Sequence, residues 1–202
     1  MNRNKGMQMK QDRRESADTD SQSIRLFGEI SWLWVNSPLH QEWPVALLGI
    51  NIIPPIHHQQ FMLLRQKEMP VAYCSWAFFD LAAEKKYLAD VNSLQLPDWA
   101  SGDRMWLIDW VAPFGHSFSL YKEMRARFPN KIARAMRVDA NEKNARIQEI
   151  RGKGVSRSMA HEKFNGYFRD IVGDYTATVL SEDKQKNCQS GVICQIEQYH
   201  FN

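Results

Sequence analysis

The sequence predicts a single α/β domain, in which helices lie on the faces of a central sheet. From Ile24 onward, segments with a helical spacing of apolar residues alternate with short β-rich runs over about 150 residues. The chain has 202 residues, 44% of them hydrophobic, including seven Trp and ten Phe. Such a chain can bury a sizeable core, and its length fits one domain with tails.

The first predicted helix follows a polar extension. Residues 1–23 are of mixed charge and lack the apolar stretch of a signal peptide, so we expect them to be disordered. From Ile24, apolar residues recur at steps of three and four, through Ile30 to Trp34, which predicts a helix. This helix ends before Pro38, because the residue before a proline avoids helical dihedral angles.

The next segments predict a β-hairpin. Residues 45–53 are nearly all apolar and end at Pro54-Pro55, which is typical of a buried strand or a short helix. Residues 60–65 and 71–79 are β-rich runs joined by the polar residues 66–70, and they predict two antiparallel strands.

The second half of the domain continues the alternation of helices and strands. The run RMWLIDWV at residues 104–111 predicts a central strand, although Asp109 interrupts its apolar character. The remaining patterns predict helices at 81–91, 119–128 and 157–175, and strands at 132–138 and 146–150. We place the domain at residues 24–175 and a C-terminal tail at 176–202.

Composition excludes several classes of function. A net charge of +3 and a pI near 8.7 are only mildly basic, and no RNA-binding or zinc motif accompanies them, so we expect no nucleic-acid partner. The three cysteines, Cys74, Cys188 and Cys194, are too few for a disulfide framework and complete no metal site. No apolar run approaches the length of a membrane span. We therefore expect a metal-free protein of the cytoplasm.

Two titratable residues stand out in apolar surroundings. His40 ends the segment SWLWVNSPLH, three residues after Ser37, and Asp109 lies within the apolar strand. A buried carboxylate is costly unless it is paired, so Asp109 either lies at an exposed end of the sheet or orients a histidine. His40 is the candidate partner, although a lone histidine beside aromatic residues is more often structural.

A basic stretch runs from Lys122 to Arg137 and contains a single acid, Glu123. Such a run is usually a solvated face, but it would also attract an acidic protein. Its cations are Lys122, Arg125, Arg127, Lys131, Arg134 and Arg137.

Five motifs in one order carry a family resemblance: SWLWVNSPLH, WPVALLGINIIPPI, PVAYCSWAFF, SGDRMWLIDWVAPFG and FPNKIARAMRVD. Together they resemble the toxin-activating lysine acyltransferases of RTX-toxin operons, over about residues 24–175. The resemblance implies a GNAT-like fold, and it implies transfer of a fatty acyl chain from an acyl carrier protein to internal lysines of an RTX protoxin. It also implies a homodimer, no bound cofactor, and His40 and Asp109 as the catalytic pair.

The chemistry of acyl transfer to lysine fits that pair. A lysine with a pKa of about 10.4 is neutral in only about one molecule in 2,500 at pH 7, so a base must remove a proton before attack on a thioester. His40 suits this role, with Asp109 orienting and charging it. An acyl–enzyme route remains open, in which Ser37 or His40 takes the acyl group first. Ser37 could instead bind the substrate, but a hydroxyl at such a position is more often a turn or capping group. For Cys74 a buried, inert thiol is the better interpretation.

Two further residues match the family's motifs and have open roles. Asn51 could donate to the oxyanion or the thioester carbonyl, or it could satisfy the backbone beside Pro54. Arg137 could bind a phosphate or the substrate, or it could pair with a carboxylate.

Residues 112–119 hold one glycine where GNAT enzymes have a glycine-rich loop for coenzyme A. This argues against an acyl-coenzyme A enzyme acting on a small amine; a non-catalytic toxin escort is the third alternative.

Overall fold

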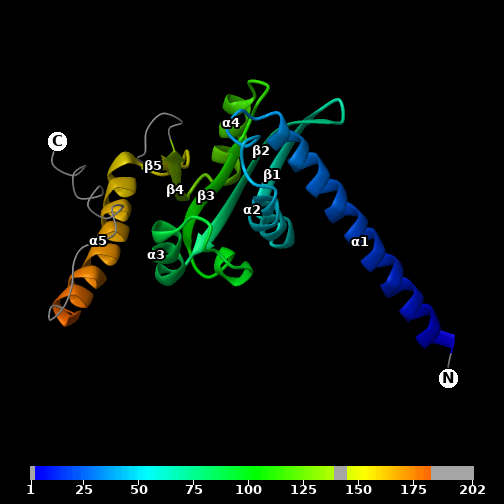
Figure 1. The fold of residues 1–202 in the computed structure, drawn as a ribbon, viewed down its shortest axis with the longest axis horizontal. Coiled ribbons are helices and arrows are strands. Elements are labelled where there is room, and N and C mark those ends of the chain that lie inside the picture. The colour runs from blue at the N-terminus through cyan, green and yellow to red at the C-terminus, as the bar shows by residue number, and fades with distance from the viewer. Residues whose placement is uncertain (1–2, 139–144, 183–202) are drawn as a thin grey trace.

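A computed structural model describes residues 3–138 and 145–182 of the chain (Figure 1). In chain order its elements are α1 (Arg3–Val35), α2 (Ala46–His57), β1 (Phe61–Gln66), β2 (Met69–Phe79), α3 (Leu81–Ala89), the 3₁₀ turn η1 (Leu96–Trp99), β3 (Arg104–Val111), α4 (Ser117–Arg127), β4 (Ile132–Val138), β5 (Ala145–Arg151) and α5 (Arg157–Glu182). No helix in this described part of the chain is long and apolar enough to cross a bilayer.

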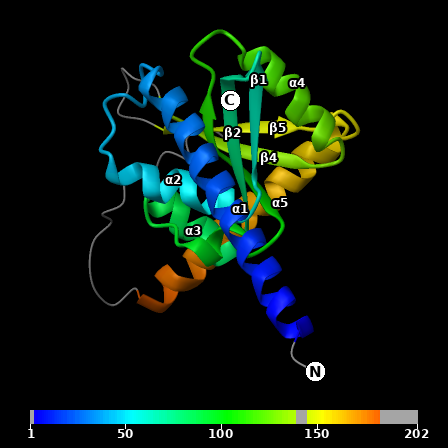
Figure 2. The ribbon, with the colours of Figure 1, turned by 90° about the vertical axis from the view of Figure 1, so that its right-hand side faces the viewer.

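The five strands form one open sheet in the order β1-β2-β3-β4-β5. All neighbours are antiparallel except β3 and β4, which run parallel because α4 crosses over between them. Helices flank this sheet (Figures 1 and 2). The prediction of one α/β domain is confirmed, and the arrangement is consistent with the GNAT-like fold that the resemblance implied.

The two faces of the sheet carry different helices, as the alternation along β2 makes clear. Tyr73 packs with α1 and α2, and Ala77 and Phe79 pack with α3. Cys74 and Trp76 point to the opposite face, where α4 contributes its buried side chains. The side chains of α1 and those of α4 therefore lie on opposite faces of the sheet.

The predicted hairpin is confirmed as β1 and β2, which pair from Phe61↔Ser75 to Gln66↔Met69. Lys67 and Glu68 form the two-residue turn with φ angles of 49° and 66°. Two positive φ values match the right-handed twist of the strands, so this short turn fixes the register of the hairpin.

Three boundaries differ from the prediction. Of the two alternatives for residues 45–53, the short helix is confirmed, although α2 begins at Ala46 and continues through Pro54 and Pro55 to His57. Helix α1 begins at Arg3, so residues 3–23, for which composition predicted disorder, are drawn as helix; they contain no proline, and most are adequate helix formers. Helix α5 reaches Glu182, and the rest of the predicted tail, with Cys188 and Cys194, lies outside the described residues.

Candidate active site

His40 lies in a tight series of turns that follows α1. The helix stops at Val35, and the chain then folds back through backbone bonds from Ser37 N–H to the Trp34 carbonyl and from His40 N–H to the Ser37 carbonyl, both 3.0 Å. These turns bring the Ser37 and His40 side chains together and direct the ring toward the sheet. Only 4% of the His40 surface is exposed.

Both nitrogens of the His40 ring are engaged. Nδ1 lies 2.7 Å from Ser37 Oγ, and Nε2 lies 2.9 Å from Asp109 Oδ1. The ring is also held between two indoles, with its centroid 4.8 Å from that of Trp34 and 4.6 Å from that of Trp43. The predicted partnership of His40 with Asp109 is thus present in the structure, 69 residues apart in sequence.

A β-bulge brings Asp109 to this position. Ser75 pairs with Asp109 and Trp76 with Leu107, so Ile108 has no partner on β2. The extra residue interrupts strict alternation, and it leaves Leu107 and Trp110 on the α4 face while Asp109 points to the α1 face. Bulges commonly re-aim a side chain beside an active site in this way.

Three donors converge on the Asp109 carboxylate. Oδ1 accepts from His40 Nε2 and, at 2.8 Å, from the Trp110 backbone N–H, and Oδ2 accepts from Trp34 Nε1 at 2.8 Å. These bonds compensate the burial of a carboxylate that is only 8% exposed. The interpretation that Asp109 lies at an exposed end of the sheet is therefore wrong.

The hydrogen bonds fix the tautomer of a neutral His40. An ionised carboxylate only accepts, so the proton of the ring must lie on Nε2. Nδ1 then carries the free lone pair and accepts from the Ser37 hydroxyl. The site is a Ser–His–Asp chain in which the basic nitrogen faces the serine.

The sheet opens beside Asp109. β3 and β4 pair only over Met105–Leu107 and Ala133–Ala135, although both strands continue beyond these residues. Figure 2 shows β4 and β5 running at a steep angle to β1 and β2. Asp109, two residues beyond Leu107, therefore lies where β3 no longer pairs with β4.

Two other predicted residues do not join this chain. The Asn51 amide donates to the Leu47 carbonyl one turn earlier in α2, at 3.0 Å, rather than to a backbone group beside Pro54. Arg137 is exposed on β4, two residues beyond the segment that pairs with β3.

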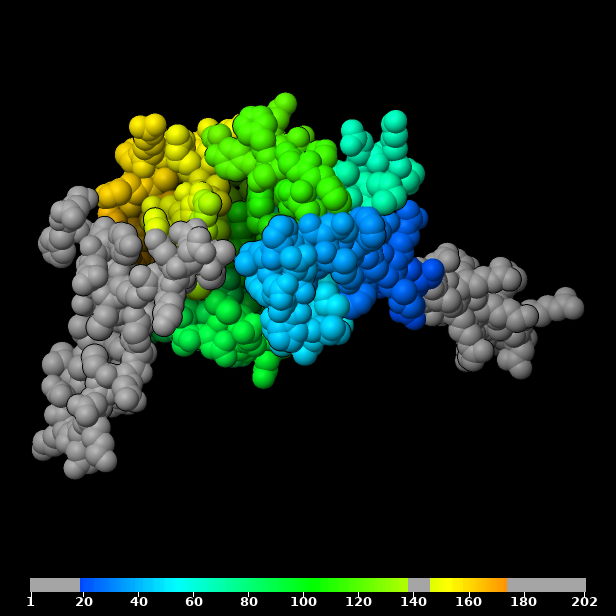
Figure 3. Space-filling model, turned by 45° about the horizontal axis from the view of Figure 1, so that its top comes forward, coloured from blue at the N-terminus to red at the C-terminus, as the bar shows by residue number. Residues whose placement is uncertain are grey.

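The predicted basic surface divides into two groups. Lys122, Arg127 and Lys131 are exposed on or just after α4, and Arg125 is half-buried over the Tyr121 ring. In Figure 3 this green segment lies next to the light-blue turn that carries His40. Arg134 does not belong to this surface.

Arg134 is buried, and the prediction that it docks a carrier protein is wrong. It pairs with Glu84, a fully buried carboxylate that also accepts from Arg104 Nη1 at 2.8 Å and Trp106 Nε1 at 2.6 Å. Burial lowers the pKa of Arg134 to about 10. The sequence pattern gives no sign of this ionic cluster, because Glu84 is 20 residues from Arg104 and 50 from Arg134 in the chain.

Cys74 has no environment for nucleophilic chemistry. It is fully buried on β2, and burial first, with the nearby Asp109 charge second, raises the pKa of its thiol far above the usual range. A thiol held protonated is a poor nucleophile. Within the described residues, no three His, Cys, Asp or Glu side chains cluster as metal ligands would.

Sequence reasoning also missed the role of two tryptophans. Trp34 belongs to the apolar stripe that predicted α1, and its indole N–H also donates to Asp109. Trp43 packs on the His40 ring from the other side. The only signal was the density of Trp around SWLWVNSPLH, since buried Trp usually requires a hydrogen-bond acceptor.

Known proteins match this chain over the segment that builds the site. The model of the RTX toxin acyltransferase family matches residues 19–151. The RTX-I toxin-activating lysine-acyltransferase ApxIC of Actinobacillus pleuropneumoniae is 46% identical over 151 residues, which cover 75% of this chain and 88% of that protein.

Two further relatives carry names that specify the acyl group. The protein-lysine myristoyltransferase RtxC of Kingella kingae is 50% identical over 145 residues, covering 72% of this chain and 87% of the relative. The protein-lysine myristoyltransferase HlyC of Escherichia coli is 46% identical over 149 residues, which cover 74% of this chain and 88% of the relative. The chain belongs to the RTX toxin acyltransferase family.

Proposed function

We propose that this protein transfers a fatty acyl chain from an acyl carrier protein to lysine side chains of an RTX protoxin and thereby activates the toxin. The observation that carries the proposal is the buried Ser37–His40–Asp109 chain in a member of this family. It is supported by relatives named as toxin-activating lysine acyltransferases.

In a direct transfer, His40 acts as the base through Nδ1. The lysine must lose a proton before its Nζ attacks the thioester carbonyl, and the Ser37 hydroxyl can relay that proton to Nδ1 because the two atoms are hydrogen-bonded. Asp109 stabilises the imidazolium that results. The C–N bond then forms, and the nitrogen releases its second proton to solvent as the amide develops. The C–S bond breaks, and the imidazolium gives the first proton to the leaving thiolate.

An acyl–enzyme route uses the same atoms in another order. The Ser37 oxygen attacks the thioester while its proton moves to Nδ1, and an acyl ester and a free thiol form. A neutral lysine then displaces the ester and regenerates the hydroxyl. Incubation with donor alone separates the two routes, because only the second adds the acyl mass to the enzyme at Ser37.

The surface around α4 suits an acidic carrier protein as donor. Lys122, Arg127 and Lys131 would steer such a partner and bind it weakly in salt. The loop before α4 has a single glycine, Gly115 at φ 84°, which suits one phosphodiester of a phosphopantetheine arm better than a pyrophosphate. We place the protein in the cytoplasm with its donor, and we propose a homodimer as in the family.

A reconstituted reaction tests this function. Purified protein is mixed with the protoxin and either acyl carrier protein or coenzyme A carrying the same acyl group, and the protoxin mass is followed. We expect acylated lysine with the carrier protein and little with coenzyme A. Preference for coenzyme A would favour an ordinary GNAT donor, and no transfer with either donor would favour a toxin escort.

A further inference from the structure

The Ser37–His40–Asp109 chain is closed to solvent, although its reaction requires contact with substrates. The side chain of His40 is 2% exposed and that of Asp109 is 7% exposed, and Ser37 is also buried. In the proposed reaction a substrate must reach Ser37 Oγ or His40 Nδ1, because proton transfer requires hydrogen-bond distance. Part of the surroundings of the His40 ring must therefore move before the reaction can begin.

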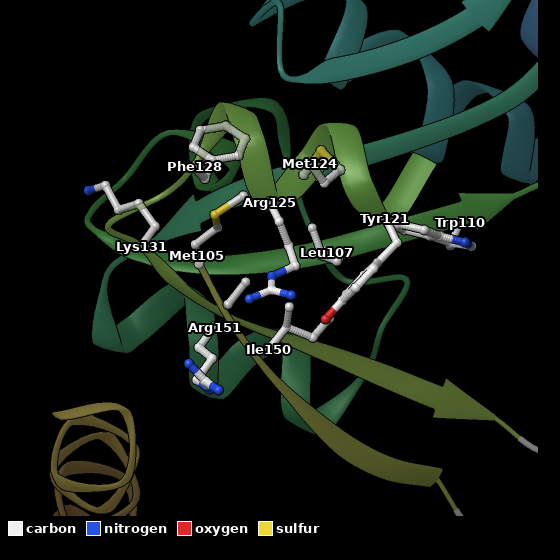
Figure 4. A pocket seen from close by; sticks show the side chains of 12 residues that line it. Met105, Leu107, Trp110, Tyr121, Met124, Arg125, Phe128, Lys131, Ile150 and Arg151 are labelled. Carbon is white, nitrogen blue, oxygen red and sulfur yellow. The ribbon is translucent and has the colours of Figure 1, made fainter. Parts of the chain in front are cut away.

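The opposite face of the sheet offers no entry to the pair. On that face, Leu107 and Trp110 of β3 pack under the side chains of α4 (Figure 4). The cavity left between them is about 30 Å³, which is room for about one or two water molecules. Neither a lysine side chain nor a thioester fits there, so a substrate must approach from the side of α1 and the turn that carries His40.

Of the two indoles that hold the His40 ring, Trp34 is fixed in place. It is 3% exposed and packs in the core of α1 with Ile30 and Leu33. Its indole N–H also donates to Asp109 at 2.8 Å. Displacement of Trp34 would break a hydrogen bond on which the site depends, so this indole is the fixed wall beside His40.

Trp43 is held much less firmly. It is 37% exposed and lies in a turn, residues 41–45, in which every residue is exposed. Its ring centroid is 4.6 Å from that of His40 and 5.2 Å from that of Trp34, which it meets edge-on at 88°. One aromatic pair favours the closed position by about 2- to 13-fold, and two pairs favour it by about 5- to 150-fold. A substrate that binds at this turn can overcome such a preference.

We propose that Trp43 is the gate of the catalytic pair: it covers His40 in the free enzyme and moves aside when a substrate takes its place. This role rests on the proposed function, to which it adds control over what receives the acyl group. Water competes with lysine for the thioester carbonyl. When water attacks, a C–O bond forms, the C–S bond breaks, and His40 passes the proton of the water to the thiolate, which gives a free fatty acid and a thiol. A cover that yields only to a bound substrate keeps water from His40.

Chemical modification of His40 tests the cover independently of acyl transfer. Diethyl pyrocarbonate acylates a neutral imidazole that it can reach, and peptide masses give the rate at each histidine. In Trp43→Ala we expect His40 to react at least about fivefold faster than in the wild type, while the exposed His161 on α5 reacts at an unchanged rate. Trp32→Ala is the matched control, because Trp32 is 45% exposed on α1 and is not one of the two indoles in contact with His40.

The fate of the acyl group is the second readout. Each enzyme receives acyl carrier protein with the protoxin, and free fatty acid and acylated lysine are both measured. We expect the ratio of free acid to acyl-lysine to rise at least about fivefold in Trp43→Ala and to stay at the wild-type value in Trp32→Ala.

An unchanged reactivity of His40 or an unchanged product ratio in a folded Trp43→Ala enzyme would overturn the proposal. Should that variant fail to fold, Trp43→Phe keeps a smaller ring on His40 and should raise both values by about twofold or more. Unchanged values in Trp43→Phe would then be equally decisive. Absence of transfer by the wild type would instead contradict the proposed function, and the modification of His40 would still decide whether Trp43 covers it, so the two failures are distinguishable.

Discussion

Replacement of Asp109 by asparagine tests the hydrogen bonds on which the site depends. The carboxylate accepts from three donors, His40 and the Trp110 backbone on Oδ1 and Trp34 on Oδ2. An amide has one accepting oxygen and one donating nitrogen, so it cannot satisfy all three. If the amide oxygen faces His40, the NH₂ group meets the indole N–H of Trp34, and two donors face each other. If the amide oxygen faces Trp34 instead, the NH₂ group meets His40 Nε2 and forces the other tautomer of the ring.

The structure sets the size of both effects. One buried donor left without an acceptor costs about 1–3 kcal/mol of unfolding free energy. The charge that stabilises imidazolium is also lost, and in serine proteases the equivalent change lowers kcat by roughly 10⁴-fold. For Asp109→Asn we therefore expect kcat to fall by about 10³–10⁴-fold and stability to fall by about 1–3 kcal/mol.

Trp34→Phe separates these two effects. It removes the donor to Oδ2 and leaves the charge of Asp109, so we expect kcat within about tenfold of wild type despite lower stability. In the double variant Trp34→Phe/Asp109→Asn, the indole N–H no longer faces the NH₂ group of the asparagine. The free energy of unfolding should therefore recover, while kcat should stay low. Turnover at saturating donor and urea unfolding of all four proteins test this. A kcat within tenfold of wild type for Asp109→Asn would show that Asp109 is structural.

Three further predictions address other parts of the account. Ser37→Ala should lower kcat by at least about 100-fold, since the lone pair of His40 faces Ser37, and an unchanged rate would exclude both relay and acyl ester. The double variant Lys122→Glu/Arg127→Glu should bind the carrier protein at least about tenfold more weakly than the wild type. The control variant Lys163→Glu/Arg169→Glu, which changes two exposed cations on α5, should bind it normally. Binding by the wild type should also weaken as the salt concentration rises. Glu84→Gln should cost about 3–5 kcal/mol in urea unfolding, because two arginines lose their buried counter-charge, and a loss below about 1 kcal/mol would contradict that role.

The sequence predicted the elements that depend on local pattern. The hairpin of β1 and β2, strand β3 and helix α4 follow from apolar spacing and from turn residues. The pairing of His40 with Asp109 was one of two alternatives that the sequence left open, because a carboxylate in an apolar strand must either reach solvent or find a partner.

What the sequence could not predict depends on contacts between distant segments. The bulge at Ile108 arises from the pairing of β2 with β3, and without it alternation would place Asp109 on the α4 face. Arg134 reads as one more cation in a basic run, and only the position of Glu84 across the core makes it an internal partner. The apolar residues 45–53 fit a strand or a helix equally well, and tertiary packing decided for the helix.

The central claim is that His40 drives acylation of protoxin lysines, and the intact mass of co-expressed protoxin tests it most directly. With the wild-type protein we predict a mass gain of one or more fatty acyl groups, located on lysine by peptide mapping. With a correctly folded His40→Ala protein we predict no gain. The same gain with His40→Ala, or an unmodified protoxin with the wild type, would contradict the account.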